Sequence, residues 1–440
     1  MENSSVSCSA EDKVKQFQAY LRKYENDDKL VILLAVDKPG SKPGDNYTSI
    51  VVKTKLVGTR GDGNPYIKNV ITKSIVQKRA IAGLIDVYAL FRMEKHVYQK
   101  ILPVLGPFNP QCIHADRENV TMEDLAVKGY INCERRNFLD LDHTVCALKK
   151  LAKFHASALA VKLKDPQLFG ELTEPLEEVI YSDNSETAPM RMCSQMSLQS
   201  SLKSLELIEP RTQELQAVID HIASYIGKTY DIMYRIFNAP KEKYHTICHG
   251  DTWMNNMLFL HDNDGKIIDL KFVDYQICRH TSLATDIHYF IYSSVQSSLI
   301  KKSYESLIRI YHTEFLKELR RLNVDEQILA ELDKEWLEKE LRTYALYGAL
   351  IGCFMVNPIL AEEEEVLEFE KIGFSSDNPM YSTDKRVMNV SQKKLDRIES
   401  VTSHYYRRYC LGIINDDLEP ISTATHNGYD GIYNRYTKSV

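Results

Sequence analysis

The pattern of apolar and polar positions changes character near residue 126. Before this point, helical spacing of apolar residues alternates with runs rich in β-branched residues. In chain order the pattern predicts a helix, three strands, a second helix ended by Pro103 and a last short strand: 11–24, 29–36, 46–58, 66–76, 84–101 and 118–126. We therefore expect residues 1–126 to form a small lobe that contains a sheet.

Beyond Leu139 the pattern becomes almost entirely helical. One apolar stripe at three- and four-residue steps contains Leu141, Val145, Leu148, Ala152, His155 and Leu159. Further helices are predicted over 196–237, 283–323 and 325–356, with short β-rich runs only over 244–276. This predicts a helical lobe at 127–420 and a polar tail at 421–440. The fold class is therefore expected to be α+β, with two lobes and a ligand cleft between them.

Composition and charge narrow the class of partner. The net charge of −6 and the isoelectric point of about 6.1 give no electrostatic footprint for nucleic acid or an anionic membrane. The nine cysteines include no CxxC pair, which favours free thiols in a reducing compartment. The first residues lack the features of a secretory signal, and the most apolar run, 344–356, is shorter than a membrane span. We expect a cytoplasmic protein without nucleic-acid or membrane partners.

Two charged residues fall on apolar faces of the first lobe. Alternation along 66–76 puts Lys73 on the same face as Ile71 and Ile75. Glu94 interrupts the apolar stripe of the following helix. Because an unpaired buried charge costs several kcal/mol, two such charges close in sequence predict that Lys73 and Glu94 form a pair. Kinase-like folds use such a pair to hold the phosphates of ATP.

The connection between the first two predicted strands carries a weak phosphate-binding signal. Gly40 and Gly44 lie in "PGSKPGDNYTS", which is not a GxGxxG motif. Backbone N–H groups around 45–49 could cover phosphates, but a plain hairpin loop fits the same residues equally well.

The stretch "CHGDTWMNNMLF" carries the strongest chemical signal. Asp251 follows a His-Gly pair, Asn256 comes five positions later, and Asp274 lies in the apolar run "FVDYQ". This spacing fits a catalytic loop in which Asp251 accepts the proton of a substrate hydroxyl. Asn256 and Asp274 offer the hard oxygen ligands that Mg²⁺ prefers. The set predicts a phosphotransferase that uses ATP and Mg²⁺.

These segments also resemble a known family. "HGDTWMNNMLF", "DLKFVDYQ" and "SLATDIHYFIYSS" are similar to motifs of the ecdysteroid kinase-like family, within the choline kinase and aminoglycoside phosphotransferase superfamily. "GDNYTS", "EDLAVKGY" and "ALKKLAKFHASAL" occur in the same order, so the resemblance covers roughly 40–300. This sequence departs from the family pattern at Tyr275, where family members often have Phe. The segment "VITKSIV" has no distinctive residues on either side of Lys73.

The resemblance implies a bilobal protein-kinase-like fold and phosphorylation of a small-molecule hydroxyl by ATP and Mg²⁺. It implies Asp251 as the catalytic base, Asn256 and Asp274 as magnesium ligands, and Lys73 as the phosphate lysine with Glu94 as its partner. Ecdysteroids are the acceptors that give the family its name, and hydroxylated xenobiotics are the alternative.

We expect structural roles for several residues near Asp251, Asn256 and Asp274. We expect His249 to brace the catalytic loop, Asp286 to anchor its backbone from a helix N-terminus, and His155 to be a hydrogen-bonded core residue. Asn255 is expected to face away from the metal if its segment is extended. Adenine is expected to dock against backbone groups at 123–125.

Two other functions remain open on the sequence. One is a metallohydrolase with His245, His249, Asp251 and Asp274 as ligands, although two histidines four apart on a short strand do not share a face with Asp251 in the required way. The other is a nucleotide-binding regulator without turnover.

Overall fold

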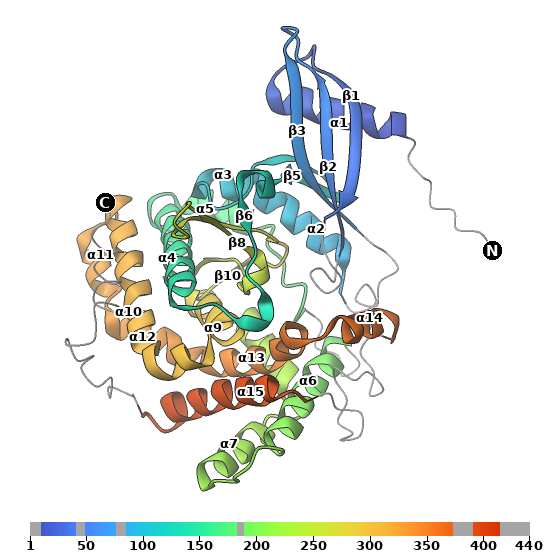
Figure 1. The fold of residues 1–440 in the computed structure, drawn as a ribbon. Coiled ribbons are helices and arrows are strands. Elements are labelled where there is room, and N and C mark those ends of the chain that lie inside the picture. Colours follow the sequence, from blue (N-terminus) through green and yellow to red (C-terminus); the bar gives the residue numbers. More distant parts are fainter. Residues whose placement is uncertain (1–9, 41–48, 76–84, 183–188, 373–389, 414–440) are drawn as a thin grey trace.

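The computed structural model of the chain describes residues 10–40, 49–75, 85–182, 189–372 and 390–413. Within these ranges a twisted sheet with one helix projects from a larger, mostly helical body (Figure 1). The predicted α+β class, with a small sheet-bearing lobe and a larger helical lobe, is confirmed. The polar tail at 421–440 lies outside the described residues.

The sheet of the first lobe is antiparallel, and its strands follow the order β1-β2-β3-β5-β4. The strands are β1 (Val31–Pro39), β2 (Ser49–Thr59), β3 (Pro65–Ile75), β4 (Cys112–Ala115) and β5 (Asn119–Glu123). The four-residue strand β4 was not predicted, since it is too short to show a period of two. It forms because β5 offers it a hydrogen-bonding edge.

The two faces of this sheet lie against different parts of the molecule. Helix α1 (Ala10–Glu25) packs on one face, where Phe17 and Leu21 form a small core with Leu56, Tyr66 and Val70. Because side chains alternate along β3, Ile71 and Lys73 point to the opposite face. That face looks toward the helical body (Figure 1).

The helix after β3 differs from its prediction at both ends. Helix α2 (Val87–His96) begins at Asp86, whose carboxylate accepts the N–H groups of Tyr88 and Ala89. A π-helical turn, η2 (Val97–Ile101), and α3 (Leu102–Leu105) then continue past Pro103. The prediction that Pro103 ends the helix is wrong. The π turn starts a new α segment there, and a first turn tolerates a residue without an N–H group.

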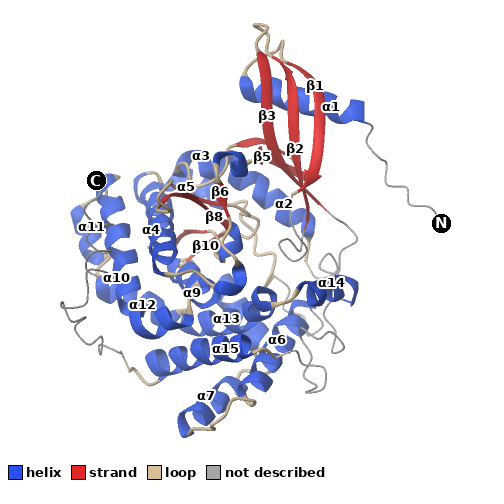
Figure 2. Cartoon of the chain, viewed as in Figure 1, coloured by secondary structure: helices blue, strands red, loops and turns tan. Residues whose placement is uncertain are grey.

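The second lobe is built mainly of helices, with five short strands at its centre (Figure 2). The helices are α4 (Leu141–Lys164), α5 (Pro166–Thr173), α6 (Pro189–Leu205), α7 (Gln213–Ala223), α8 (Thr229–Asn238), α9 (Leu283–Ser294), α10 (Ser297–Arg321), α11 (Glu326–Glu331), α12 (Lys334–Thr343), α13 (Ala345–Leu360), α14 (Glu363–Ile372) and α15 (Gln392–Tyr405), with the π turn η6 (Tyr406–Cys410). The strands are β6 (Tyr130–Ile131), β7 (Thr246–Cys248), β8 (Met257–His261), β9 (Ile267–Phe272) and β10 (Arg279–Thr281). Three short 3₁₀ turns are η3 (Leu125–Lys128), η4 (Arg135–Asn137) and η5 (Met254–Asn256).

The predicted helix at 141–159 is the single helix α4, whereas the predicted helical ranges 196–237, 283–323 and 325–356 each contain more than one helix. The break between α9 and α10 shows why, because it is held by a side chain from far along the chain. The buried guanidinium of Arg397 donates to the carbonyl oxygens of Ile291, Tyr292 and Val295. A contact made by a residue about a hundred positions away leaves no trace in the local apolar period.

Helix α13 confirms the prediction of a buried helix at 344–356. It packs closely on α9 because Gly348 has no side chain: an added Cβ would lie 2.7 Å from the Cβ of His288. In the described residues no single helix is long and apolar enough to cross a membrane. The pair α12 and α13, bent by 54° at its break, meets that test together, by length and composition only.

The buried His288 makes stability depend on pH. Burial lowers the pKa of His288 to about 4, below the value of about 6.5 in an unfolded chain. The unfolded chain therefore takes up a proton first as the pH falls below 6.5, and this contribution to stability is lost from there toward pH 4.

We predict a loss of about 1.4 kcal/mol from His288 between pH 7.5 and pH 5.5. Urea unfolding followed by tryptophan fluorescence measures it, because both tryptophans, Trp253 and Trp336, lie in the second lobe. The His288→Gln variant should lose about 1.4 kcal/mol less over the same interval. An identical pH dependence in the variant and the parent would contradict the assignment.

Candidate functional site

A cavity of about 810 Å³ lies between the sheet and the second lobe. Its apolar walls are Val51, Ile71 and Met122 from the sheet and Leu258 and Val273 from the opposite lobe. Its polar groups include Lys73, Glu94, Asn256 and Asp274. A volume of several hundred Å³, with apolar walls and a few converging polar groups, is typical of a small-molecule or cofactor site.

Lys73 and Glu94, which both line this cavity, contact each other. The ammonium of Lys73 lies 2.8 Å from Oε2 of Glu94, and both side chains are almost completely buried. Strand β3 supplies the lysine, and the buried stripe of α2 supplies the glutamate. The two charges that interrupt apolar patterns in the sequence are therefore partners in the structure.

Lys73 also reaches across to the second lobe. Its ammonium lies 2.5 Å from Oδ1 of Asp274 and 3.2 Å from Oε1 of Gln276. Burial works to lower the pKa of Lys73, but the charges of Asp274 and Glu94 outweigh it and raise the pKa above its usual value. One ammonium thus joins residues 73, 94 and 274, which come from three separate segments.

The Glu94 carboxyl is subject to opposing effects. Burial and the nearby Asp274 raise the pKa of Glu94 above its usual value, against the effect of the Lys73 ammonium and the backbone N–H of Tyr275, which lower it. An ionised Glu94 keeps the buried Lys73 ammonium paired. The carboxyl oxygens of Glu94 and Asp274 at the cavity are the type of ligand that a divalent cation takes.

The Asp274 backbone is held in an unusual conformation. Its φ of 67° lies in the left-handed region, which residues other than glycine rarely adopt. The preceding Val273 is fixed on both sides, since its N–H donates to the carbonyl of Asn256 at 3.0 Å and its carbonyl accepts from Nε2 of His249. These bonds attach the Asp274 segment to the loop that carries Asp251 and offset the cost of the strained conformation.

The loop containing Asp251 follows β7 and turns sharply at Gly250. Gly250 has a φ of 85°, and a Cβ there would lie 2.0 Å from the carbonyl oxygen of Ile277. Only glycine fits this turn, which explains the Gly of the His-Gly-Asp motif. His249 braces the same turn as predicted, because its Nδ1 accepts the N–H of Asp251 at 3.2 Å.

The Asp251 carboxylate is held by two donors. Tyr289 O–H donates to Oδ1 at 2.6 Å, and Nδ2 of Asn256 donates to Oδ2 at 2.8 Å. Burial of the carboxyl and the nearby charge of Asp274 raise the pKa of Asp251 to about 6, against the effect of these two bonds. Asp251 is therefore an oriented carboxylate with a pKa close to neutrality, as a general base requires.

Asn256 and Asn255 both line the cavity. The Nδ2 atom of Asn256 is used by Asp251, which leaves its Oδ1 as an oxygen donor for a cation. The expectation that Asn255 faces elsewhere is wrong. It assumed an extended segment with alternating side chains, whereas 254–256 form the 3₁₀ turn η5.

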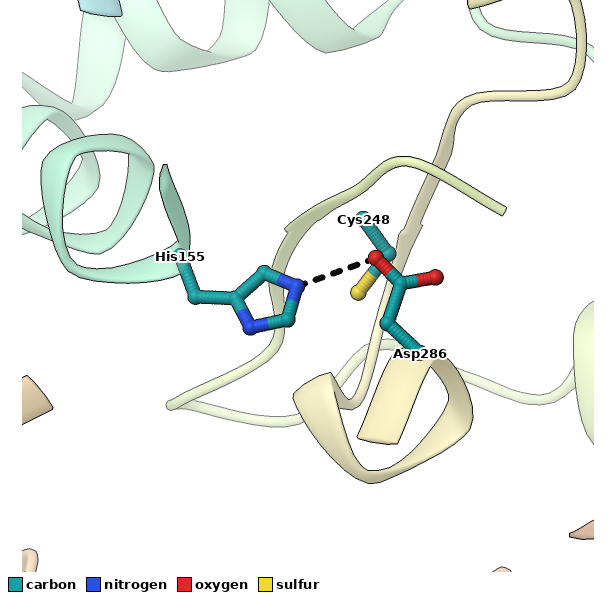
Figure 3. Close-up of side chains that lie close together, drawn as sticks. All are labelled: His155, Cys248 and Asp286. Carbon is teal, nitrogen blue, oxygen red and sulfur yellow. Dashed lines mark hydrogen bonds and ion pairs between the residues drawn. The ribbon is translucent and has the colours of Figure 1, made fainter. Parts of the chain in front are cut away.

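A buried cluster behind the loop fixes its position (Figure 3). Asp286, in the first turn of α9, accepts the backbone N–H of His249 at 2.7 Å and that of Gly250 at 2.9 Å. His155 donates to Asp286 through Nε2 and bonds Tyr311 through Nδ1. Both expectations, the anchor and the core histidine, are confirmed. Burial works to raise the pKa of Asp286, but the hydrogen bond from His155, the nearby imidazoles of His155 and His249 and the N–H of Gly250 together outweigh burial and lower the pKa.

This cluster has ligand types that could bind a metal, but its donors are already engaged. His155, Cys248 and Asp286 have ligand atoms within 4.8 Å of one another. The Cys248 thiol donates to the carbonyls of Thr281 and Ser282, and burial raises its pKa well above the usual value. The cluster is therefore a structural support.

Gln276 and Tyr289 are among the residues of the site that were missed from the sequence. Gln276 lies inside the "FVDYQ" run but carries no charge that would single it out. Tyr289 lies in a run of apolar residues on α9, where a tyrosine is typical of a core, and only its contact with Asp251 distinguishes it.

Two further predictions concern the phosphate-binding loop near Gly40 and the docking of adenine at 123–125. Gly40 lines the cavity, but residues 41–48 of the proposed phosphate loop lie outside the described residues. The N–H groups of Glu123 and Asp124 already donate to Gln111 and Asn69, so adenine docking at 123–125 remains a prediction.

The two histidines proposed as metal ligands of a metallohydrolase already have hydrogen-bonding partners. Both ring nitrogens of His245 are engaged, by the N–H of Glu242 and the hydroxyl of Tyr344. Those of His249 are engaged by Asp251 N–H and the carbonyl of Val273. Neither imidazole has a free lone pair to offer a metal.

A sheet lobe with a buried lysine–glutamate pair, facing a helical lobe that presents two aspartates and an asparagine, defines a kinase-like protein. The model of the ecdysteroid kinase-like family matches residues 43–324, more than half of the chain, and the chain belongs to this family.

Among solved structures, the chain is remotely similar to macrolide 2'-phosphotransferase MphH from Brachybacterium faecium, in its apoenzyme form. The identity is 9% and the TM-score 0.37, over 87% of this chain and 99% of that chain. No curated protein matches the chain.

The support given by Asp286 can be tested by one isosteric change. The Asp286→Asn variant should lose about 3 kcal/mol of unfolding free energy, because it removes a buried charge on which three hydrogen bonds converge. Urea unfolding measures this loss. Asp325→Asn is the matched control, since Asp325 caps α11 and Asn caps equally well. Equal stability of the two variants would contradict the assigned role.

Proposed function

We propose that this protein transfers the γ-phosphoryl group of ATP to a hydroxyl of a small molecule, with Mg²⁺ as the metal. Asp251 is the base, Asn256 and Asp274 hold the metal, and Lys73, positioned by Glu94, binds the phosphates. One observation carries the proposal: Lys73 bridges Glu94 and Asp274 in the cavity that Asn256, the hydrogen-bonding partner of Asp251, also lines.

The residues fit the two cofactors. The cavity has apolar walls on two sides, as a purine ring needs, and a cation at one end for phosphates. The oxygen atoms of Asn256 and Asp274 are the donor type that Mg²⁺ takes. When bound, the metal would neutralise phosphate charge.

The chain's own residues supply positioning and proton transfer. Lys73 places one positive charge where phosphate oxygens would lie, and Glu94 prevents it from swinging away. Asp251 accepts the proton of the acceptor hydroxyl as that oxygen attacks phosphorus. Tyr289 and Asn256 fix its two oxygens, so the carboxylate needs no reorientation during the reaction.

Beside Asp251, the second lobe has an apolar interior. The Tyr289 ring belongs to a large buried apolar cluster with Trp253 and Met355, to which α6, α7, α8, α9, α13 and α15 contribute. The Tyr289 hydroxyl also contacts Sδ of Met355 at 3.2 Å. The family to which the chain belongs makes a lipophilic alcohol, such as an ecdysteroid, the first candidate for the acceptor. A hydroxylated xenobiotic is the second candidate, since it presents the same chemistry.

The proposal is tested with a panel of ecdysteroids and hydroxylated xenobiotics incubated with the protein, ATP and Mg²⁺. Mass spectrometry should find a product heavier by one phosphoryl group. Asp251→Asn should lower kcat by about a thousandfold, as expected for loss of a general base, with the KM for ATP nearly unchanged.

The matched control for this variant is Asp262→Asn. Asp262 lies in the exposed turn between β8 and β9, where its side chain accepts two backbone N–H groups. It should retain full activity. Phosphorylation that persists undiminished in Asp251→Asn would contradict the assignment of the base.

A further inference from the structure

Gln276 is the third partner of the Lys73 ammonium. Its Oε1 lies 3.2 Å from Nζ of Lys73, and its side chain is buried. It follows Asp274 by two residues, so both partners come from the same segment of the second lobe. The proposed function gives a role to Glu94 and to Asp274, but none to this amide.

The three contacts use every N–H group of the lysine side chain. A protonated amine has three donors and no acceptor. Here the donors meet Oε2 of Glu94 at 2.8 Å, Oδ1 of Asp274 at 2.5 Å and Oε1 of Gln276 at 3.2 Å. Lys73 can therefore donate to a phosphate oxygen only when one of these contacts is given up.

The contact with Gln276 is the one that is exchanged at least cost. Hydrogen bonds from an ammonium to a carboxylate are shorter and roughly twice as strong as those to a neutral amide. The contact with Gln276 is also the longest of the three. Asp274 need not leave the lysine to meet a cation, because its second oxygen, Oδ2, can face the metal while Oδ1 stays on Lys73.

We propose that Gln276 is the exchangeable partner of Lys73: it holds one N–H of the ammonium before the nucleotide binds and yields it to a phosphate oxygen. The inference rests on the proposed function, because it concerns the phosphates that Lys73 would bind. Gln276 is thus a positioning residue, which keeps the ammonium in place without touching the reacting atoms.

The exchange predicts that two substitutions act in opposite directions. Gln276→Leu removes the acceptor at similar size and leaves one N–H of Lys73 available, so ATP should bind about fivefold more tightly. Gln276→Glu replaces the amide by a carboxylate, which holds the ammonium more strongly and repels phosphate. This variant should bind ATP at least about tenfold more weakly.

Calorimetric titration of the full-length protein with ATP and Mg²⁺ measures both effects. In steady-state kinetics the change should appear in the KM for ATP rather than in kcat. Gln276→Met, which is unbranched, repeats the first substitution should the leucine variant fail to fold. The exposed Gln213, in the first turn of α7, supplies the matched controls: Gln213→Leu and Gln213→Glu should bind ATP like the parent.

Weaker ATP binding in both Gln276→Leu and Gln276→Glu would overturn the inference, since that is what an amide with a purely structural role predicts. Unchanged binding in both variants would also overturn it. Either result, with ATP still bound by the parent, leaves the proposed function standing. A parent that binds no ATP would instead contradict the proposed function, and this inference with it.

Discussion

The ammonium of Lys73 joins the two lobes, because it touches Glu94 on one side and Asp274 on the other. Burying the Lys73 ammonium costs several kcal/mol in desolvation, which close contacts with carboxylates recover. The same contacts bring the carboxyl oxygens of Glu94 and Asp274 together at the cavity, where they could face a cation. Without Lys73, two carboxylates would face each other in a cavity of low polarity. The arrangement therefore accounts both for how the lobes sit together and for what they would bind.

Support for this cluster comes from the interior of the second lobe. The loop that carries Asp251 is held in place by the carboxylate of Asp286, and the Asp274 segment is tied to that loop by His249 and Asn256. Such buried supports keep the oxygen atoms of a site in place without touching a substrate. The strained backbone of Asp274 is consistent with this view, since strain persists where the surroundings over-determine a conformation.

The sequence was informative where a residue contradicts its own local pattern. Lys73 and Glu94 stood out because each interrupts an apolar face, and Asp251, Asn256 and Asp274 because of their spacing. Residues that agree with their pattern gave no signal. Tyr289 looks like any core tyrosine until a distant segment brings Asp251 next to it. Helix breaks such as the one held by Arg397 were missed for the same reason, since they depend on tertiary contacts.

The most direct test of the central cluster is calorimetric titration with ATP, with and without Mg²⁺, for the parent and for Asp274→Asn. In the parent, Mg²⁺ should tighten ATP binding by at least about tenfold, since the metal links Asp274 to the phosphates. In Asp274→Asn this gain should disappear, while metal-free ATP should bind at least as tightly as in the parent, because Lys73 is released from its second carboxylate. The exposed turn variant Asp264→Asn serves as the control and should behave like the parent. If Asp274→Asn keeps the full magnesium dependence, the lysine–aspartate cluster is not the nucleotide site.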